Sequence, residues 1–304
     1  MSVRPEGADR PPPLSVVVAT TRPWPELRGT LDSLLDQARA VGAEVIVADR
    51  DGAGLPALPA FADVIRVHEP GASVFRLRAL GLARARGDVV AVTEDHCRVR
   101  PGWCAEVLES HRRHPSAGVV GGVVENGATG RLLDWAHFLV SNGPFMAPVR
   151  SGARRRVSGQ ANLSYKRRAL PAEIPALGVM EMLYTRRLRA AGERLVVDDR
   201  LVVAHVQSLG FARTCASHYH NGRSIAGFRR ARMRAPERCA RLAGTALLPP
   251  FLLARTLGAV LAKRRAVGVA LASLPLMGLL VCCHAAGELV GYVSGPGTSP
   301  AHLN

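Results

Sequence analysis

The chain has 304 residues, and 40 Lys and Arg residues against 24 Asp and Glu residues give it a formal net charge of +16. Hydrophobic residues make up 48% of the chain and its mean hydropathy is +0.09, which excludes a disordered basic protein, because such chains are poor in apolar residues. Aromatic residues make up only 5%, which leaves few rings to stack on bases, so we expect no nucleic-acid partner.

The first part of the chain alternates short apolar runs with segments of helical spacing. The apolar runs predict strands at residues 14–20, 44–49, 63–67, 88–93 and 117–124. The helical spacing predicts helices at residues 25–41, 73–86 and 101–114. This alternation predicts an α/β fold with a mostly parallel sheet flanked by helices.

Polar residues follow three of these strands directly. They are Thr20 at the end of the first strand, Asp49 at the end of the second, and Glu94-Asp95-His96 after the fourth. Ligands of parallel α/β sheets bind beyond the carboxyl ends of the strands, so these residues mark the expected site.

Glu94 and His96 are two residues apart, and they could converge on one ion if the chain turns there. A carboxylate and an imidazole suit Mn²⁺ or Mg²⁺ when most other donors are oxygens, as in a bound diphosphate. The alternative is a polar turn in which a carboxylate caps the helix that follows Pro101.

The sequence after residue 125 is less regular. A helix is predicted at 181–191, and short strands at 194–197 and 201–206, the second of which contains His205. Glu181 opens this helix, where the helix dipole favours an acid whether or not it has a catalytic role.

The last hundred residues combine positive charge with long apolar runs. Residues 205–304 hold twelve basic and two acidic residues, and seven arginines lie between 223 and 241. Apolar runs follow at 242–262, interrupted by Pro249-Pro250 and Arg255, and at 266–293. A membrane span needs about 20 apolar residues. The pattern favours an in-plane first helix and a single span beside anionic lipid, over the alternative of two buried core helices.

Four segments follow from these patterns. We expect a flexible N-terminal tail at 1–13, a catalytic domain at 14–210, a basic juxtamembrane helical region at 211–241, and membrane-associated helices at 242–304.

The catalytic segment resembles the family 2 glycosyltransferases of the GT-A fold from about residue 14 to residue 205. The resemblance rests on the segments Ser15-Val-Val-Val-Ala-Thr20, Glu44-Val-Ile-Val-Ala-Asp49, Gly87-Asp88-Val-Val-Ala-Val-Thr-Glu94-Asp95-His96, Pro101-Gly102-Trp103 and Gly159-Gln-Ala-Asn162. It implies a Rossmann-like domain that transfers a sugar from a nucleotide-sugar, with inversion and with the help of a divalent metal.

The resemblance also implies roles for single residues. Contacts to the nucleotide-sugar fall to Thr20, Asp49, Arg78, Asp95 and Asn162. Glu94 and His96 would bind Mn²⁺ or Mg²⁺, with His205 completing the metal ligands. Glu181 would be the catalytic base that takes the proton of the acceptor hydroxyl.

The sequence departs from the family pattern at three places. The metal motif reads Glu-x-His instead of Asp-x-Asp, Met180 occupies the first acidic position beside Glu181, and Ala79 replaces an Asn after Arg78. Met180 and the altered metal motif leave open a non-catalytic membrane protein with a decayed transferase domain. A second alternative is another nucleotide-binding α/β transferase, such as a nucleotidyltransferase.

The combined prediction is a hexosyltransferase-like enzyme at the cell membrane, with its catalytic domain in the cytoplasm. Its partners would be the nucleotide-sugar donor, a lipid-linked or polysaccharide acceptor, and membrane lipids.

Overall fold

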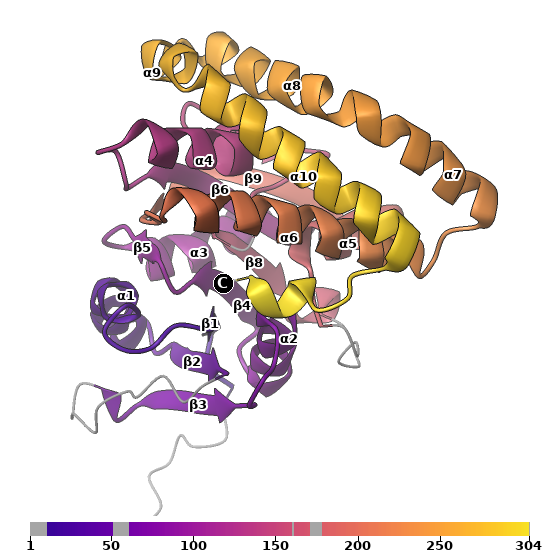
Figure 1. The fold of residues 1–304 in the computed structure, drawn as a ribbon. Helices are drawn as coiled ribbons and strands as arrows, with labels where there is room; N and C mark the ends of the chain where they lie inside the picture. The colour runs from indigo at the N-terminus through magenta and orange to yellow at the C-terminus, as the bar shows by residue number, and fades with distance from the viewer. Residues whose placement is uncertain (1–10, 51–60, 160, 171–177, 304) are drawn as a thin grey trace, which may run out of the picture.

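A computed structural model describes residues 11–50, 61–159, 161–170 and 178–303 of the chain. In this part of the chain, one sheet lies at the centre and helices cover its two faces, with an additional helical layer formed by the C-terminal third (Figure 1). Most of the predicted tail, residues 1–10, lies outside the described residues.

The sheet has the order β3-β2-β1-β4-β8-β6-β9-β5, with β7 paired to β9. Its strands are β1 (Leu14–Thr20), β2 (Glu44–Asp49), β3 (Val64–His68), β4 (Val89–Glu94), β5 (Cys97–Val99), β6 (Ala117–Asn126), β7 (Gly152–Ala153), β8 (Leu163–Lys166) and β9 (Arg194–His205). Strands β3, β2, β1, β4, β6 and β9 run in one direction, whereas β8, β5 and β7 run in the other. The predicted mostly parallel α/β fold is therefore confirmed, with antiparallel β8 between β4 and β6.

The helices of the N-terminal two thirds are α1 (Arg28–Ala40), α2 (Val74–Arg84), α3 (Trp103–Arg113), α4 (Leu132–Asn142), α5 (Glu181–Ala190), η2 (Gly143–Phe145) and η3 (Arg167–Ala169). Strands β1 and β4 are buried along their whole length, as expected for central strands with both faces covered. The amphipathic spacing of α1 is confirmed, because Leu31, Leu34 and Leu35 lie in the core.

One long strand replaces the two short strands predicted at 194–197 and 201–206. The pairing of β9 with β6 continues through both segments, with an irregularity between Gly121 and Val123. A Cβ atom on Gly122 would lie 2.3 Å from Nδ2 of Asn162, so this close approach requires glycine.

The C-terminal third consists of α6 (Phe211–Arg230), α7 (Ala235–Gly244), η4 (Thr245–Leu247), α8 (Leu248–Lys263), α9 (Val267–Ala272), α10 (Leu274–Ser294) and η5 (Ser299–His302). Pro249 and Pro250 do not interrupt α8, because they occupy its first turn, where a missing backbone N–H leaves no hydrogen bond unmade. The predicted segment boundaries at 210 and 241 fall just before α6 and inside α7.

Helices α6 and α10 cross at very short range. A Cβ atom on Gly287 would lie 2.0 Å from the carbonyl oxygen of Tyr219, and one on Gly222 would lie 2.1 Å from that of His284. Glycines on both helices therefore permit backbone-to-backbone packing. Helices α7, α8 and α9 form an outer layer beyond α10 (Figure 1).

After α10 the chain returns to the sheet. Helix η5 lies near the carboxyl ends of β1 and β2 (Figure 1), where the Arg50 guanidinium donates a 3.1 Å hydrogen bond to the carbonyl oxygen of Ala301. Leu303 belongs to the apolar cluster that includes Ala19 and Ala48. The end of the described chain thus packs beside the edge of the sheet where the site is expected.

Candidate active site

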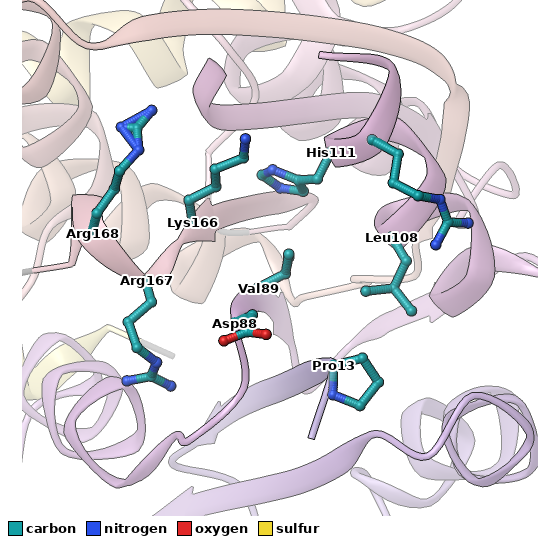
Figure 2. A pocket seen from close by; sticks show the side chains of 9 residues that line it. Pro13, Asp88, Val89, Leu108, His111, Lys166, Arg167 and Arg168 are labelled. Atoms are coloured by element: carbon teal, nitrogen blue, oxygen red, sulfur yellow. The ribbon is translucent and has the colours of Figure 1, made fainter. Parts of the chain in front are cut away.

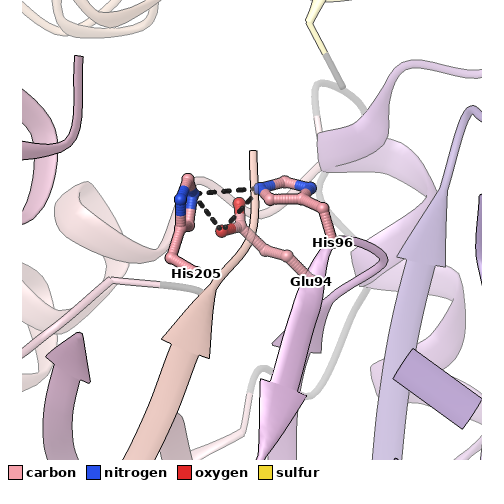
Figure 3. A group of neighbouring side chains, drawn as sticks. All are labelled: Glu94, His96 and His205. Atoms are coloured by element: carbon pink, nitrogen blue, oxygen red, sulfur yellow. Dashed lines mark hydrogen bonds and ion pairs between the residues drawn. The ribbon is translucent and has the colours of Figure 1, made fainter. Parts of the chain in front are cut away.

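Three predicted metal ligands converge at the carboxyl edge of the sheet. Figure 3 shows Glu94 at the end of β4, His96 in the following turn and His205 at the end of β9, with their polar atoms facing one another. The Nε2 atoms of His96 and His205 are 3.0 Å apart, and Oε2 of Glu94 lies 3.5 Å from the first and 3.7 Å from the second. All three side chains are buried.

Strand pairing explains how residues so distant in sequence meet. Strand β5 pairs antiparallel with β9 so that Cys97 lies opposite His205. His96 precedes this pair and is therefore placed next to His205. Strand β5 is only three residues long and was not predicted.

A hydrogen bond to Asp95 determines which nitrogen of His96 faces the cluster. Its Nδ1 lies 2.6 Å from Oδ1 of Asp95. Burial raises the pKa of Asp95, but the hydrogen bond from His96 and the charges of His96 and Arg22 outweigh it and lower the pKa overall. The Asp95 carboxylate accepts the hydrogen bond from Nδ1–H, which turns Nε2 of His96 toward Glu94 and His205.

The donor set fits a divalent cation. Burial, followed by the charges of His96 and His137, lowers the pKa of His205 well below the ordinary value, which keeps this imidazole neutral. Neutral imidazoles and a carboxylate are ligands of first-row divalent metals, including Mn²⁺. The ligand atoms of the three residues all lie within 4.8 Å of one another.

Arg78 joins this cluster to the predicted base. Its Nη1 donates a 3.2 Å hydrogen bond to Oε2 of Glu181, its Nε lies 3.2 Å from Oε1, and its Nη2 donates at 3.5 Å to Oε1 of Glu94. Glu181 is the first residue of α5 and is buried. Burial raises its pKa, and the opposing charge of Arg78 does not fully compensate. A raised carboxylate pKa suits a general base that works near neutral pH.

Thr20 completes one connected group. Its hydroxyl donates a 2.7 Å hydrogen bond to Oδ2 of Asp95, while the Thr30 hydroxyl donates at 2.7 Å to the Asp95 carbonyl oxygen. Contacts therefore run from Thr20 through Asp95 and His96 to Glu94, and from there through Arg78 to Glu181.

Residues 15–170, about half of the chain, match the family model described as glycosyl transferase family 2. The chain belongs to glycosyl transferase family 2. The predicted family is therefore confirmed, and the site described above lies partly inside the matched segment and partly, with Glu181 and His205, beyond it. No curated protein matches the sequence.

Solved glycosyltransferases share the fold. The mannosyltransferase PcManGT from Pyrobaculum calidifontis, in complex with GDP-Man and Mn²⁺, is 19% identical with a TM-score of 0.56, over 92% of this chain and 88% of that one. GalNAc-T7 with UDP, GalNAc and Mn²⁺ is 14% identical with a TM-score of 0.50, over 66% of this chain and 45% of that one. Together with the family match, these similarities confirm the GT-A fold.

Two predicted nucleotide-sugar residues lie apart from the connected group. Oδ1 of Asp49, at the end of β2, lies 2.8 Å from Nδ1 of His68. The amide of Asn162 donates to the carbonyl oxygens of Val123 and Leu201, and its oxygen accepts from Trp103. Both N–H groups of the Asn162 side chain thus donate to backbone carbonyls of the sheet in this family 2 protein. Binding of the nucleotide-sugar by Asp49 and Asn162 stays a prediction.

The motifs did not reveal a further buried histidine beside the site. The ring centroid of His137 is 6.2 Å from that of His205, and its nitrogens lie 2.9 Å from Nε2 of His218 and 2.7 Å from Oε1 of Gln207. The only sequence signal is an imidazole at a buried position of the apolar helix α4.

A separate cavity of about 400 Å³ opens at the opposite edge of the sheet (Figure 2). It is lined by Pro13, Asp88, Val89, Leu108, His111, Arg112, Lys166, Arg167 and Arg168. Lys166 donates to the Pro115 carbonyl, and Arg167 donates to the Ala85 and Gly87 carbonyls. Lys166 and Arg167 thus bind backbone carbonyls of neighbouring segments. None of the predicted site residues is among the described residues that line the cavity.

Proposed function

We propose that this family 2 protein transfers a sugar from a nucleotide-sugar to a hydroxyl acceptor, with inversion and with a divalent metal. The observation that supports this most directly is the pair of functional groups joined through Arg78: a cation-binding cluster of Glu94, His96 and His205, and the buried carboxylate of Glu181. A transfer of this type requires one group for the leaving diphosphate and one for the acceptor proton.

The chemistry follows from these groups. The acceptor oxygen attacks the anomeric carbon, Glu181 takes the hydroxyl proton, and the bond from that carbon to the diphosphate oxygen breaks with its electron pair on the leaving group. A single displacement from the face opposite the diphosphate inverts the anomeric centre. A divalent cation bound by Glu94, His96 and His205 would neutralise negative charge on the diphosphate.

The other predicted donor residues divide into two groups under this proposal. Thr20 and Asp49 lie at strand ends and would contact the nucleotide in addition to their contacts with Asp95 and His68. Arg78, Asp95 and Asn162 are engaged within the protein and would position Glu181, His96 and the sheet edge, respectively.

The solved relatives support the type of donor and metal, but leave the base open. One contains GDP-Man and the other UDP, and both contain Mn²⁺. Mn²⁺ or Mg²⁺ is accordingly the proposed cofactor. The intact convergence of ligands and base in this chain argues against a decayed, non-catalytic domain.

We also propose that the outer helices bind the cytoplasmic face of a membrane and that the acceptor is lipid-linked or polysaccharide. Two helices, Ala235–Lys263 and Leu274–Ser294, are long and apolar enough to cross a membrane by length and composition. The packing of α10 against α6 favours docking in the plane of the surface. Leu247 and Phe251 are 71% and 61% exposed, and arginines of the preceding segment would contact anionic lipid.

A hydrolysis screen of nucleotide-sugars with Mn²⁺ and with Mg²⁺ tests the proposed reaction. We expect metal-dependent release of UDP or GDP from one donor, suppressed by a chelator and strongly reduced in His205→Ala. His114→Ala, which lies outside the cluster, is the control and should retain activity. Metal-dependent release of pyrophosphate from a nucleoside triphosphate, with no activity on nucleotide-sugars, would instead assign a nucleotidyltransferase.

A further inference from the structure

Arg22 lies just beyond the end of β1 with one edge of its guanidinium unused. Its Nη1 donates a 3.0 Å hydrogen bond to Oε2 of Glu26. Its Nε and Nη2 are buried and have no hydrogen-bond partner among the described residues. The side chain is only 10% exposed. Buried donors of this kind are costly to leave unpaired, so they call for a partner that is present during function.

The unused edge has a specific recognition geometry. Nε and Nη2 lie on the same side of the planar guanidinium, with parallel N–H bonds. This fork matches two oxygens of a phosphate or carboxylate, which explains why arginine is preferred for bidentate binding of such anions.

The register of the sheet places this fork at the metal cluster. Ala19 of β1 is paired with Glu94 of β4, and Arg22 follows three residues later. A tight turn, in which the Arg22 backbone N–H donates to the Thr20 hydroxyl at 3.0 Å, folds the chain back there. Nε of Arg22 is 3.7 Å from Oδ1 of Asp95, the same oxygen that accepts from His96.

The nearby carboxylate does not satisfy this edge. The 3.7 Å separation from Asp95 exceeds hydrogen-bond distance, and both Asp95 oxygens already accept short bonds, from Thr20 and His96. The arrangement therefore holds a guanidinium beside Asp95 and leaves its Nε and Nη2 atoms without a hydrogen-bond acceptor among the described residues.

We propose that Arg22 binds the diphosphate of the donor through its Nε and Nη2 atoms, beside the cation held by Glu94, His96 and His205. This inference rests on the proposed function, because a nucleotide-sugar supplies the diphosphate. It adds a second positive group for the charge that develops as the glycosidic bond to the diphosphate breaks.

The test compares Arg22→Met and Arg22→Lys with the control Arg28→Met, an exposed arginine on α1 that pairs with Asp32. The probes are Mn²⁺ alone, and inorganic pyrophosphate, UDP and GDP in the presence of Mn²⁺, measured by calorimetry on the full chain. We expect R22M to weaken pyrophosphate and the preferred nucleoside diphosphate by about 10- to 150-fold, as for loss of hydrogen bonds to a charged group. R22K keeps the charge without the fork and should lie between R22M and the wild type.

Affinity for Mn²⁺ alone separates this role from a structural one. Removal of a positive charge beside the cation should leave Mn²⁺ binding unchanged or make it tighter. Loss of Mn²⁺ affinity equal to the loss of pyrophosphate affinity would show that Arg22 acts by orienting Asp95 and His96, and would overturn the proposal. So would unchanged pyrophosphate binding in R22M with a thermal unfolding midpoint like that of the wild type.

Failure of the proposed function gives a different result. In that case the wild-type chain binds neither pyrophosphate nor a nucleoside diphosphate with Mn²⁺, and the inference about Arg22 falls with it. If the wild type binds them and R22M binds them equally well, only the inference about Arg22 fails.

Discussion

The carboxyl edge of the sheet and the outer helical layer differ in which side chains they bury and which they expose. At the edge, charged side chains such as Glu94, Arg78 and Glu181 are buried and compensate one another. In the outer layer, apolar side chains such as Leu247 and Phe251 are exposed to solvent. Buried charge is retained where chemistry needs it, and a large exposed apolar surface marks contact with another phase or partner. The two regions therefore indicate two separate tasks.

The largest expected effect concerns the buried edge. Glu181→Gln keeps the shape of the side chain but removes the base, so we expect the rate of sugar transfer to fall about 10²- to 10⁴-fold. Nucleotide affinity, measured by calorimetry, should stay near the wild-type value. Glu109→Gln, at a surface acid of α3, is the control. An E181Q variant with wild-type transfer would remove Glu181 from the mechanism.

The next effect concerns the packing that joins the two regions. Gly287→Ala would place a Cβ atom 2.0 Å from the Tyr219 carbonyl oxygen, so we expect destabilisation of about 1–3 kcal/mol. Gly278→Ala lies in the same helix and meets no described atom within 4 Å, so its better helix propensity should stabilise by about 1 kcal/mol. Thermal unfolding measures both variants. Equal shifts of the same sign would contradict the close crossing of α6 and α10.

The smallest effect concerns the outer layer. Phe251→Glu should weaken binding to vesicles that contain anionic lipid about tenfold or more, because an exposed ring that could insert is replaced by a repelled charge. Phe211→Glu, at a 54% exposed phenylalanine on α6, is the matched control and should bind like the wild type. Co-sedimentation measures both. Equal binding by F251E and the wild type would leave the outer layer without a membrane role.

The sequence predicted what depends on local pattern. Continuous apolar runs identified β1, β2 and β4, and the polar residues directly after them marked the edge where the cluster forms. The strands β5 and β8 were not predicted, because they have only three and four residues and their pairing partners are distant in the chain. The prediction of two strands in place of β9 failed because polar Asp198 and Asp199 interrupt its apolar pattern.

Single contacts were harder to predict than elements. The resemblance implied that Asp95 contacts the nucleotide-sugar, and this role stays a prediction; no motif indicated that its carboxylate also contacts Thr20 and His96. The free edge of Arg22 depends on a turn, a register and a partner for Nη1, none of which the sequence states. Such contacts depend on the tertiary packing of residues that are distant in the chain, so local sequence propensity does not predict them.

The short connection between α10 and η5 limits how far the two regions can move apart. Residues 295–298 are all that separates them, and a fully extended chain of this length reaches roughly 15 Å at most. Helix η5 is tied to the sheet by Arg50, and Leu303 packs in the cluster that includes Ala48, next to Asp49. The connection thus limits the distance between the end of α10 and η5. A displacement of α10 beyond this limit would require η5 and Leu303 to leave the carboxyl end of β2.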